Sequence, residues 1–197
     1  MLTIGLTGPT GAGKSAAAAA FAGRGAAVID ADAVAREVTA PGSPCLGELA
    51  ARFGPGIKRA DGRLERAALA ALAFESSDGR AALNAITHKY ILVRIRELLA
   101  AHRDAGAAAA VVDAPLLFES GFDSECDFTV AVTAPKEVRL RRVMARDGIT
   151  HDAAELRMKA QHDCEWYASR AGFVIVNNGG LDEVGPQIEE ICTKMGI

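Results

Sequence analysis

Five short apolar runs recur along the chain, separated by longer stretches of helical pattern. They cover residues 2–6, 26–29, 109–112, 128–132 and 173–176. Several are continuous rather than alternating, which is typical of parallel strands covered on both faces. Strands that alternate with helices predict a doubly wound α/β sheet. In such a sheet, ligands bind at the carboxyl ends of the strands.

The stretch between the second and third runs has little strand character. Turn-rich breaks at residues 41–45 and 53–62 are surrounded by helical patterns at 65–74 and 80–102. A crossover between parallel strands needs only about a dozen residues. We therefore predict a core of residues 1–35 and 105–197, and a helical insertion of residues 36–104 that carries a second substrate.

The sequence GPTGAGKS at residues 8–15 follows the first predicted strand and precedes the alanine-rich helical stretch SAAAAAF. It fits the pattern G-x-x-x-x-G-K-[ST], in which flexible glycines let backbone N–H groups point at phosphates. The lysine reaches the terminal phosphates and the serine hydroxyl holds Mg²⁺. The alternative is a chance glycine-rich turn, which the strand and helix on either side disfavour. We predict a P-loop NTPase-type fold that binds a nucleotide through Gly8, Gly11, Ala12, Gly13, Lys14, Ser15 and Ala16.

Residues 135 to about 161 predict a short helical hairpin. Pro135 suits the first position of a helix, Gly148 a stop, and Thr150 the cap of a second helix. Three arginines share one face of the first helix at positions i, i+3 and i+7: Arg139, Arg142 and Arg146. A solvated basic face explains the spacing equally well. In a phosphate-handling protein, however, arginines on a mobile lid stabilise charge on a transferring phosphoryl group.

Carboxylates follow the second and third predicted strands. The sequence VIDAD places Asp30 and Asp32 at the end of an extended segment, where residues i and i+2 point the same way. One of them is a candidate to accept a proton from an attacking hydroxyl, with the other orienting Mg²⁺ or capping the next helix; both are alternatively helix caps. Asp113 resembles the second acidic element of P-loop enzymes, which helps to hold the metal. Glu119 is either a surface residue or a ligand for a base or sugar.

Composition and charge argue against several classes of partner and site. The net charge of −3 over 197 residues gives no basic footprint, so we do not expect nucleic acid as a partner. No segment approaches the roughly 18 apolar residues needed to span a bilayer, and the N-terminus lacks the features of a signal peptide. The four cysteines and four histidines are too dispersed to indicate a disulfide framework or a zinc site. We expect a cytoplasmic protein with reduced thiols.

Taken together, these residues resemble the dephospho-coenzyme A kinase family over nearly the whole chain. The P-loop by itself is unspecific, but its combination with later segments at these distances is highly specific. These segments are IDAD at 29–32, DGRLERAAL at 61–69, PLLFE at 115–119, RLRRVMARD at 139–147, Gln161 and NNG at 177–179.

The resemblance implies an ATP- and Mg²⁺-dependent kinase that phosphorylates the ribose 3′-hydroxyl of dephospho-CoA. It implies that Lys14 and Ser15 contact phosphates and magnesium, that Asp32 is the general base, and that Arg142 and Arg146 belong to the ATP-side lid. Asn177 and Asn178 would lie near the adenine, although a simple strand-to-helix turn explains them equally well. The substrate-binding residues that it implies are Asp32, Arg66, His88, Leu116 and Glu119.

The chain departs from the usual family pattern at a few positions. Gly-Ile is common where Pro9 and Thr10 stand, and Pro9 lacks an N–H that could bind phosphate. Threonine is common at Ala16, a proline follows the histidine where Lys89 stands, and Ala-Asp is common at residues 171–172. None of these changes removes a residue with an assigned chemical role.

Three alternatives fit parts of the sequence. Another small P-loop kinase would share the loop and lid, but the long helical insertion with PLLFE argues against it. A regulatory GTPase would need an N-K-x-D motif, which the sequence lacks. A non-catalytic nucleotide-binding module would not need Asp32 beside the phosphates.

Overall fold

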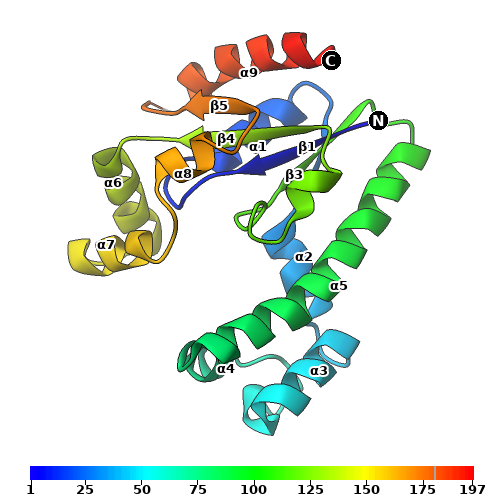
Figure 1. The fold of residues 1–197 in the computed structure, drawn as a ribbon, viewed down its shortest axis with the longest axis vertical. Coiled ribbons are helices and arrows are strands. Elements are labelled where there is room, and N and C mark those ends of the chain that lie inside the picture. The colour runs from blue at the N-terminus through cyan, green and yellow to red at the C-terminus, as the bar shows by residue number, and fades with distance from the viewer. Residues whose placement is uncertain (180) are drawn as a thin grey trace. The chain divides into compact units, whose positions relative to one another are not determined.

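The computed structural model describes residues 1–179 and 181–197, and the chain forms two compact units (Figure 1). One unit contains residues 1–29 and 99–197, and the other contains residues 30–98. Each has an apolar core of its own. The division into a core of 1–35 and 105–197 with an insertion of 36–104 stays a prediction.

A five-stranded sheet forms the larger unit, with the strand order β2-β3-β1-β4-β5. The strands are β1 (Leu2–Thr7), β2 (Ala27–Asp30), β3 (Ala109–Asp113), β4 (Phe128–Thr133) and β5 (Phe173–Val176). β1 pairs in parallel with β3 and β4, and β4 pairs in parallel with β5. The predicted doubly wound α/β class is confirmed. The central strand β1 ends at the glycine-rich loop, so the sheet presents that loop at its carboxyl edge.

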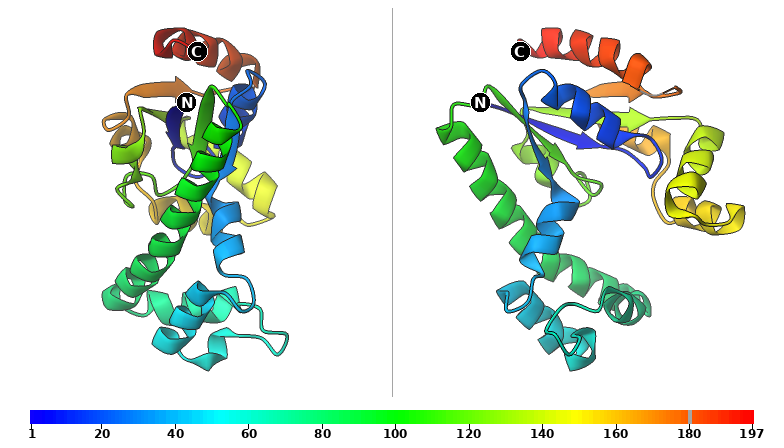
Figure 2. Two further views of the ribbon diagram at one scale, coloured as in Figure 1. Left: turned by 90° about the vertical axis from the view of Figure 1, so that its right-hand side faces the viewer. Right: turned by 180° about the vertical axis from the view of Figure 1, so that it is seen from behind.

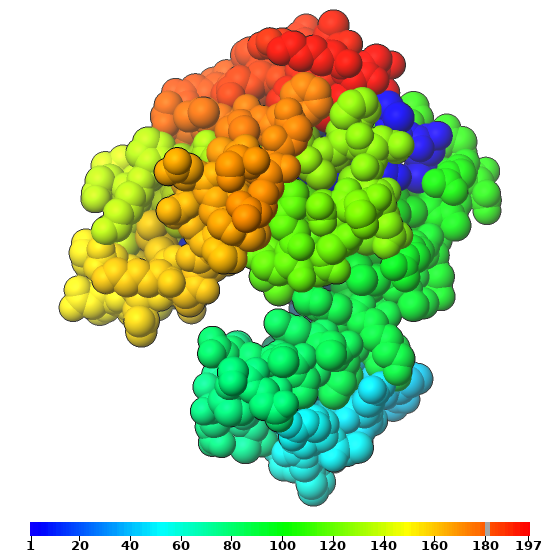
Figure 3. Space-filling model, in the orientation of Figure 1, coloured from blue at the N-terminus to red at the C-terminus, as the bar shows by residue number. Residues whose placement is uncertain are grey.

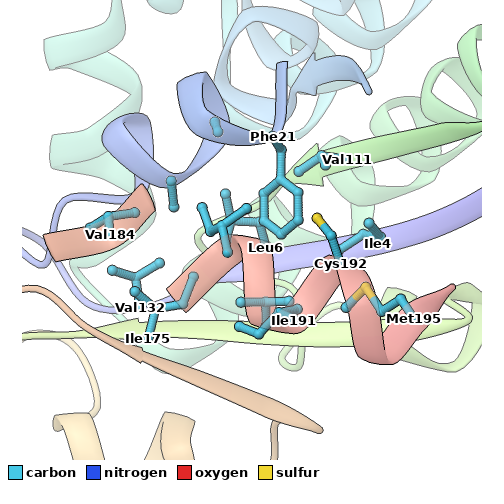
Figure 4. Packing of buried hydrophobic residues seen from close by; sticks show 14 of the residues in the cluster. Ile4, Leu6, Phe21, Val111, Val132, Ile175, Val184, Ile191, Cys192 and Met195 are labelled. Atoms are coloured by element: carbon cyan, nitrogen blue, oxygen red, sulfur yellow. The ribbon is translucent and has the colours of Figure 1, made fainter. Parts of the chain in front are cut away.

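Two helices lie along one face of this sheet, as Figure 2 shows: α1 (Lys14–Ala22) and α9 (Leu181–Met195). Alternate strand residues such as Ile4, Leu6 and Val132 point to this face and pack with both helices (Figure 4). Phe21 from α1 is completely buried among them. Burying a side chain of that size contributes about 1.5–3 kcal/mol. This core fixes the start of α1 against the end of β1.

A helical hairpin follows β4, formed by α6 (Lys136–Asp147) and α7 (His151–Lys159). Gly148 ends α6 with φ of 64°, and the Thr150 hydroxyl caps α7 by accepting the Ala153 N–H. Apolar side chains from both helices pack together: Leu140, Val143, Ala154 and Met158. The predicted hairpin and its stop and cap residues are therefore present. A short helix, α8 (Cys164–Ala168), then leads into β5.

The second unit is helical. It contains α2 (Ala31–Val38), α3 (Pro44–Phe53), a 3₁₀ turn (Pro55–Ile57), α4 (Arg66–Phe74) and α5 (Ser77–Asp104) up to residue 98. Its core is formed by Cys45, Leu46, Leu49, Ile57 and Leu69. α5 begins three residues before the predicted pattern at residue 80, because the Ser76 hydroxyl accepts the Gly79 N–H and provides a helix cap.

Lys89 lies inside α5, where the family pattern has a proline. Its ammonium group lies 3.1 Å from a Glu48 carboxylate oxygen and 4.9 Å from the centre of the Tyr90 ring. The Tyr90 hydroxyl donates to the same Glu48 oxygen. These contacts tie α5 to α3, and a lysine N–H lets the helix continue without the interruption that a proline causes. Across residues 1–179 and 181–197, no helix combines the length and the apolar character needed to cross a membrane.

Candidate active site

The loop between β1 and α1 has a shape that only glycine permits at three positions. Gly8, Gly11 and Gly13 have φ values of 138°, 77° and 97°. A Cβ atom on Gly8 would lie 2.2 Å from the Val132 carbonyl oxygen, and one on Gly13 would lie 2.1 Å from Nδ2 of Asn177. Both the backbone conformation and the surrounding atoms therefore require glycine.

This loop leaves the N-terminus of α1 open. Gly13 is the N-cap residue, and because glycine has no side chain it makes no capping hydrogen bond to the first turn of the helix. The amide groups there carry the partial positive charge of the helix dipole, which makes the helix start a favourable site for an anion. Lys14 adds a full positive charge and reaches back across the loop, where its Nζ donates to the Gly8 carbonyl at 3.3 Å. Ser15, the next residue, is exposed.

Arg142 of α6 joins the loop to the end of β5. Its guanidinium group donates to the carbonyl oxygens of Gly11 and Ala12, each at 3.4 Å. It also donates to the backbone and side-chain oxygens of Asn177, each at 3.1 Å. Asn177 is buried, and its Nδ2 donates to the Ala12 carbonyl at 3.0 Å. The two residues were predicted separately, and the structure places them together beside the open helix end.

Arg146 lies one turn further along α6. Its guanidinium group donates two hydrogen bonds to the Asp147 carboxylate, at 2.7 and 2.9 Å, and one to the Thr10 hydroxyl at 3.4 Å. Arg157 of α7 donates to the same carboxylate. The hydrogen bond from Arg146 is the largest cause that holds the pKa of Asp147 below its usual value, and it raises the pKa of Arg146 in return. Asp147 thus orients a charged lid arginine beside the loop.

Two further side chains contact the loop at Thr10. Gln161 accepts the Thr10 N–H at 2.7 Å, and Nε of Arg139 donates to the Thr10 carbonyl oxygen at 3.0 Å. No role was predicted for Gln161, although it stands in the family pattern. Arg139 shares the predicted basic face, yet it is buried rather than solvated. The spacing of the arginines was the available signal, but it does not reveal which side chain turns inward.

The end of β3 places an acidic residue beside β1, close to where the loop begins. Asp113 is the last residue of β3 and pairs with Leu6 of β1. Further along, Leu116 is exposed, and the charge of Glu119 acts on the buried Tyr167 side chain. Burial and the nearby Glu119 charge raise the pKa of Tyr167 to about 12, so the tyrosine remains a hydrogen-bond donor at neutral pH.

Three predicted site residues, Asp32, Arg66 and His88, belong to the helical unit. The expectation that Asp30 and Asp32 share one direction along an extended segment is wrong, because the backbone becomes helical at Ala31. Asp30 is the N-cap of α2 and accepts the N–H groups of Asp32 and Ala33.

The Asp32 carboxylate, in the first turn of α2, is exposed. Nη2 of Arg66 donates to the Thr39 hydroxyl at 3.3 Å, which restrains that side chain.

Figure 3 shows α8 on the surface, between the α6–α7 hairpin and the segment that follows β3. The contact is aromatic: the Phe118 ring meets the Trp166 ring edge-on at 5.9 Å. His162 stacks on Trp166 with ring centres 3.7 Å apart, and the Arg170 guanidinium lies 4.2 Å from the same ring centre. These contacts hold the segment that carries Gln161 and Tyr167.

Comparison with known proteins gives a consistent result. A family model described as dephospho-CoA kinase matches residues 2–183. A dephospho-CoA kinase of Moorella thermoacetica is 46% identical over 92% of this chain and 86% of its own length. One from Syntrophotalea carbinolica is 42% identical over 99% of this chain and 92% of its own length. A crystal structure of a Thermus thermophilus protein superimposes with a TM-score of 0.84 at 33% identity, covering 98% of this chain and 97% of that one.

Proposed function

The chain belongs to the dephospho-CoA kinase family, and we propose that it transfers the γ-phosphoryl group of ATP to the ribose 3′-hydroxyl of dephospho-CoA, giving CoA and ADP. This reaction is the final step of CoA biosynthesis. The four cysteines are free thiols, which supports a reducing, cytoplasmic setting for it.

The observation that carries this proposal is the open N-terminus of α1 with three cations around it. The first-turn amides of the helix would hold the β- and γ-phosphates, and Lys14 would neutralise charge between them. Arg142 and Arg146 would meet the same phosphates from α6, where arginine supplies charge and fixed geometry. Asn177 and Asn178, at the end of β5, would lie beside the adenine.

The residues next to the loop fit a magnesium ion. Mg²⁺ prefers oxygen ligands and is usually held by one or two protein groups together with substrate phosphates. Ser15 offers an exposed hydroxyl at the start of α1, and Asp113 offers a carboxylate at the end of the neighbouring strand. When bound with ATP, the ion would neutralise charge that develops on the phosphate oxygens.

Four residues are the proposed contacts for the acceptor. Arg66, restrained by Thr39, and His88 are the proposed contacts on the helical side. Leu116 and Glu119 are those of the segment after β3. Asp32 would accept the proton of the ribose hydroxyl as it attacks phosphorus. Its exposed carboxylate and the engagement of Asp30 in capping support Asp32 rather than Asp30 for this role.

A panel of acceptors tests the proposal directly. The purified protein is incubated with ATP and Mg²⁺, and ADP release is measured with dephospho-CoA, AMP or gluconate as the acceptor. We expect dephospho-CoA to give much the highest kcat/KM and the product to be CoA phosphorylated at the 3′ position. Comparable turnover of AMP or gluconate would contradict the assignment.

A further inference from the structure

The glycine-rich loop contains a tight turn at residues 9–12. The Ala12 N–H donates to the Pro9 carbonyl at 3.1 Å, which closes a four-residue turn. Gly11, at the third position, has φ of 77°, the value that a type II turn requires there. This turn immediately precedes Gly13 and the amides at the start of α1 that we propose for the nucleotide.

The hydrogen bond of the turn uses neither of the two backbone polar groups of Thr10. Both are bound by side chains distant in the sequence. Gln161, just after α7, accepts the Thr10 N–H at 2.7 Å, and Arg139 of α6 donates to the Thr10 carbonyl at 3.0 Å. The Thr10 peptide groups are therefore clamped from both ends by the two ends of the helical hairpin.

Arg139 is itself held in place. It is only 6% exposed, and its Nη1 donates to the Cys164 sulfur at 3.3 Å, while that sulfur lies 3.4 Å from the Ala134 carbonyl oxygen. A buried guanidinium with fixed partners loses little conformational freedom when it holds the loop. Its position among these groups indicates a constraint on the loop rather than a phosphate contact.

We propose that Gln161 and Arg139 are positioning residues, which fix the Thr10 peptide groups and so hold the loop in its phosphate-binding shape before ATP arrives. Preorganisation of this kind lowers the entropy that a ligand must overcome on binding. It also links the loop to the hairpin that carries Arg142 and Arg146, so that displacement of the hairpin would loosen the loop. This inference rests on the proposed use of the loop for ATP.

Substitution of Gln161 by methionine tests the clamp, because methionine has a similar length and no oxygen to accept the Thr10 N–H. The matched control is Thr129→Val, which removes another side-chain acceptor of a backbone N–H, that of Gly172 at 2.9 Å. Thr129 lies in the amino-terminal part of β4, whereas the loop follows the carboxyl end of β1. Gln161→Glu keeps an acceptor oxygen and serves as the rescue variant.

Two measurements are made on the full-length protein without any acceptor: the exchange rate of the Thr10 amide hydrogen, and the Kd for ATP from a titration. We expect Gln161→Met to accelerate Thr10 exchange and to raise the Kd for ATP by roughly 2- to 12-fold, the equivalent of one neutral hydrogen bond. Thr129→Val should change neither, and Gln161→Glu should keep Thr10 exchange slow. In steady-state assays, kcat of Gln161→Met at saturating ATP should stay near the wild-type value.

Unchanged Thr10 exchange in Gln161→Met would overturn the clamp, and so would faster exchange with an unchanged Kd for ATP. If the Kd for ATP rose equally in Thr129→Val, the rise would reflect general destabilisation, and the clamp would also be overturned. Arg139→Lys is expected to weaken ATP binding in the same way. It is only a supporting variant, because replacing a buried arginine disturbs the protein more than replacing Gln161. If the wild-type protein bound ATP but did not phosphorylate dephospho-CoA, the proposed function would fail while the clamp would stand.

Discussion

Replacing Arg142 with alanine would remove the side chain that joins the nucleotide loop to Asn177. The guanidinium group lies within 3.1–3.4 Å of four oxygens on Gly11, Ala12 and Asn177. It is thus already ordered beside the start of α1, and little conformational entropy remains to be lost when it meets a phosphate. A hydrogen bond from a charged donor contributes roughly 1.5–3 kcal/mol.

That energy corresponds to a fall in kcat/KM for ATP of roughly 10- to 150-fold, if one such bond to a phosphate oxygen is lost. The free enzyme should lose stability too, because the Asn177 side-chain oxygen loses its donor. We expect a cost of about 1–2 kcal/mol, or a fall in Tm of roughly 2–8 °C for a chain of this size. The KM for dephospho-CoA should stay close to the wild-type value.

The assay is steady-state ADP release with ATP varied at saturating dephospho-CoA, and then with dephospho-CoA varied at saturating ATP. Arg141→Ala is the matched control. Arg141 is the exposed neighbour on the same helix, and its replacement by alanine removes the same charge. If kcat/KM for ATP fell equally in both variants, the loss would result from the change in net charge and not from the contacts of Arg142. If Arg142→Ala lost only affinity for dephospho-CoA, the assignment of Arg142 to ATP binding would be wrong.

Three other substitutions separate the remaining roles. Lys14→Ala should abolish most turnover while the circular dichroism spectrum stays native, because nothing else replaces its charge between the phosphates; a near-normal kcat would remove Lys14 from the mechanism. Asp32→Asn should keep the Kd for ATP and lower kcat by roughly 10²–10⁴-fold, as general-base removal does, and an unchanged kcat would refute the assignment. Asp147→Asn should destabilise the protein most at neutral pH. The folded-state pKa of Asp147 is lowered, so its contribution is present above the unfolded-state pKa and disappears as the pH falls through the folded-state value; a Tm difference from wild type that persisted below this range would contradict the pairing with Arg146.

The strands and the nucleotide loop were predictable because each depends on local sequence. An apolar run bounded by turn residues specifies a buried strand, and the first predicted run differs from β1 only in that the strand continues to Thr7. The loop depends on glycines whose positive φ values follow from the pattern itself. The stop at Gly148 and the cap at Thr150 are equally local, and both were visible in the sequence.

Contacts across the fold were not predictable in the same way. Arg139, Arg142 and Arg146 share a face of α6 by spacing, but only the packing of that helix decides which of them is buried. Their partners Thr10, Gly11 and Asn177 lie far away along the chain, and helical periodicity contains no information about such pairs. The backbone conformation directly after a strand was not predictable either: the pattern of VIDAD predicts an extended segment, yet α2 begins within it.

These distant contacts explain how one short loop acquires a defined shape despite its three glycines. Glycine permits the required conformation but does not enforce it, since the unfolded and alternative loop states are equally open to it. Side chains outside the loop add to the bonds that the loop makes within itself. In the larger unit they come from α6, from the segment after α7 and from the end of β5: Arg139 and Arg142, Gln161, and Asn177. Every one of these contacts involves a peptide group of Thr10, Gly11 or Ala12, the residues directly before the start of α1, where we propose that the phosphates bind.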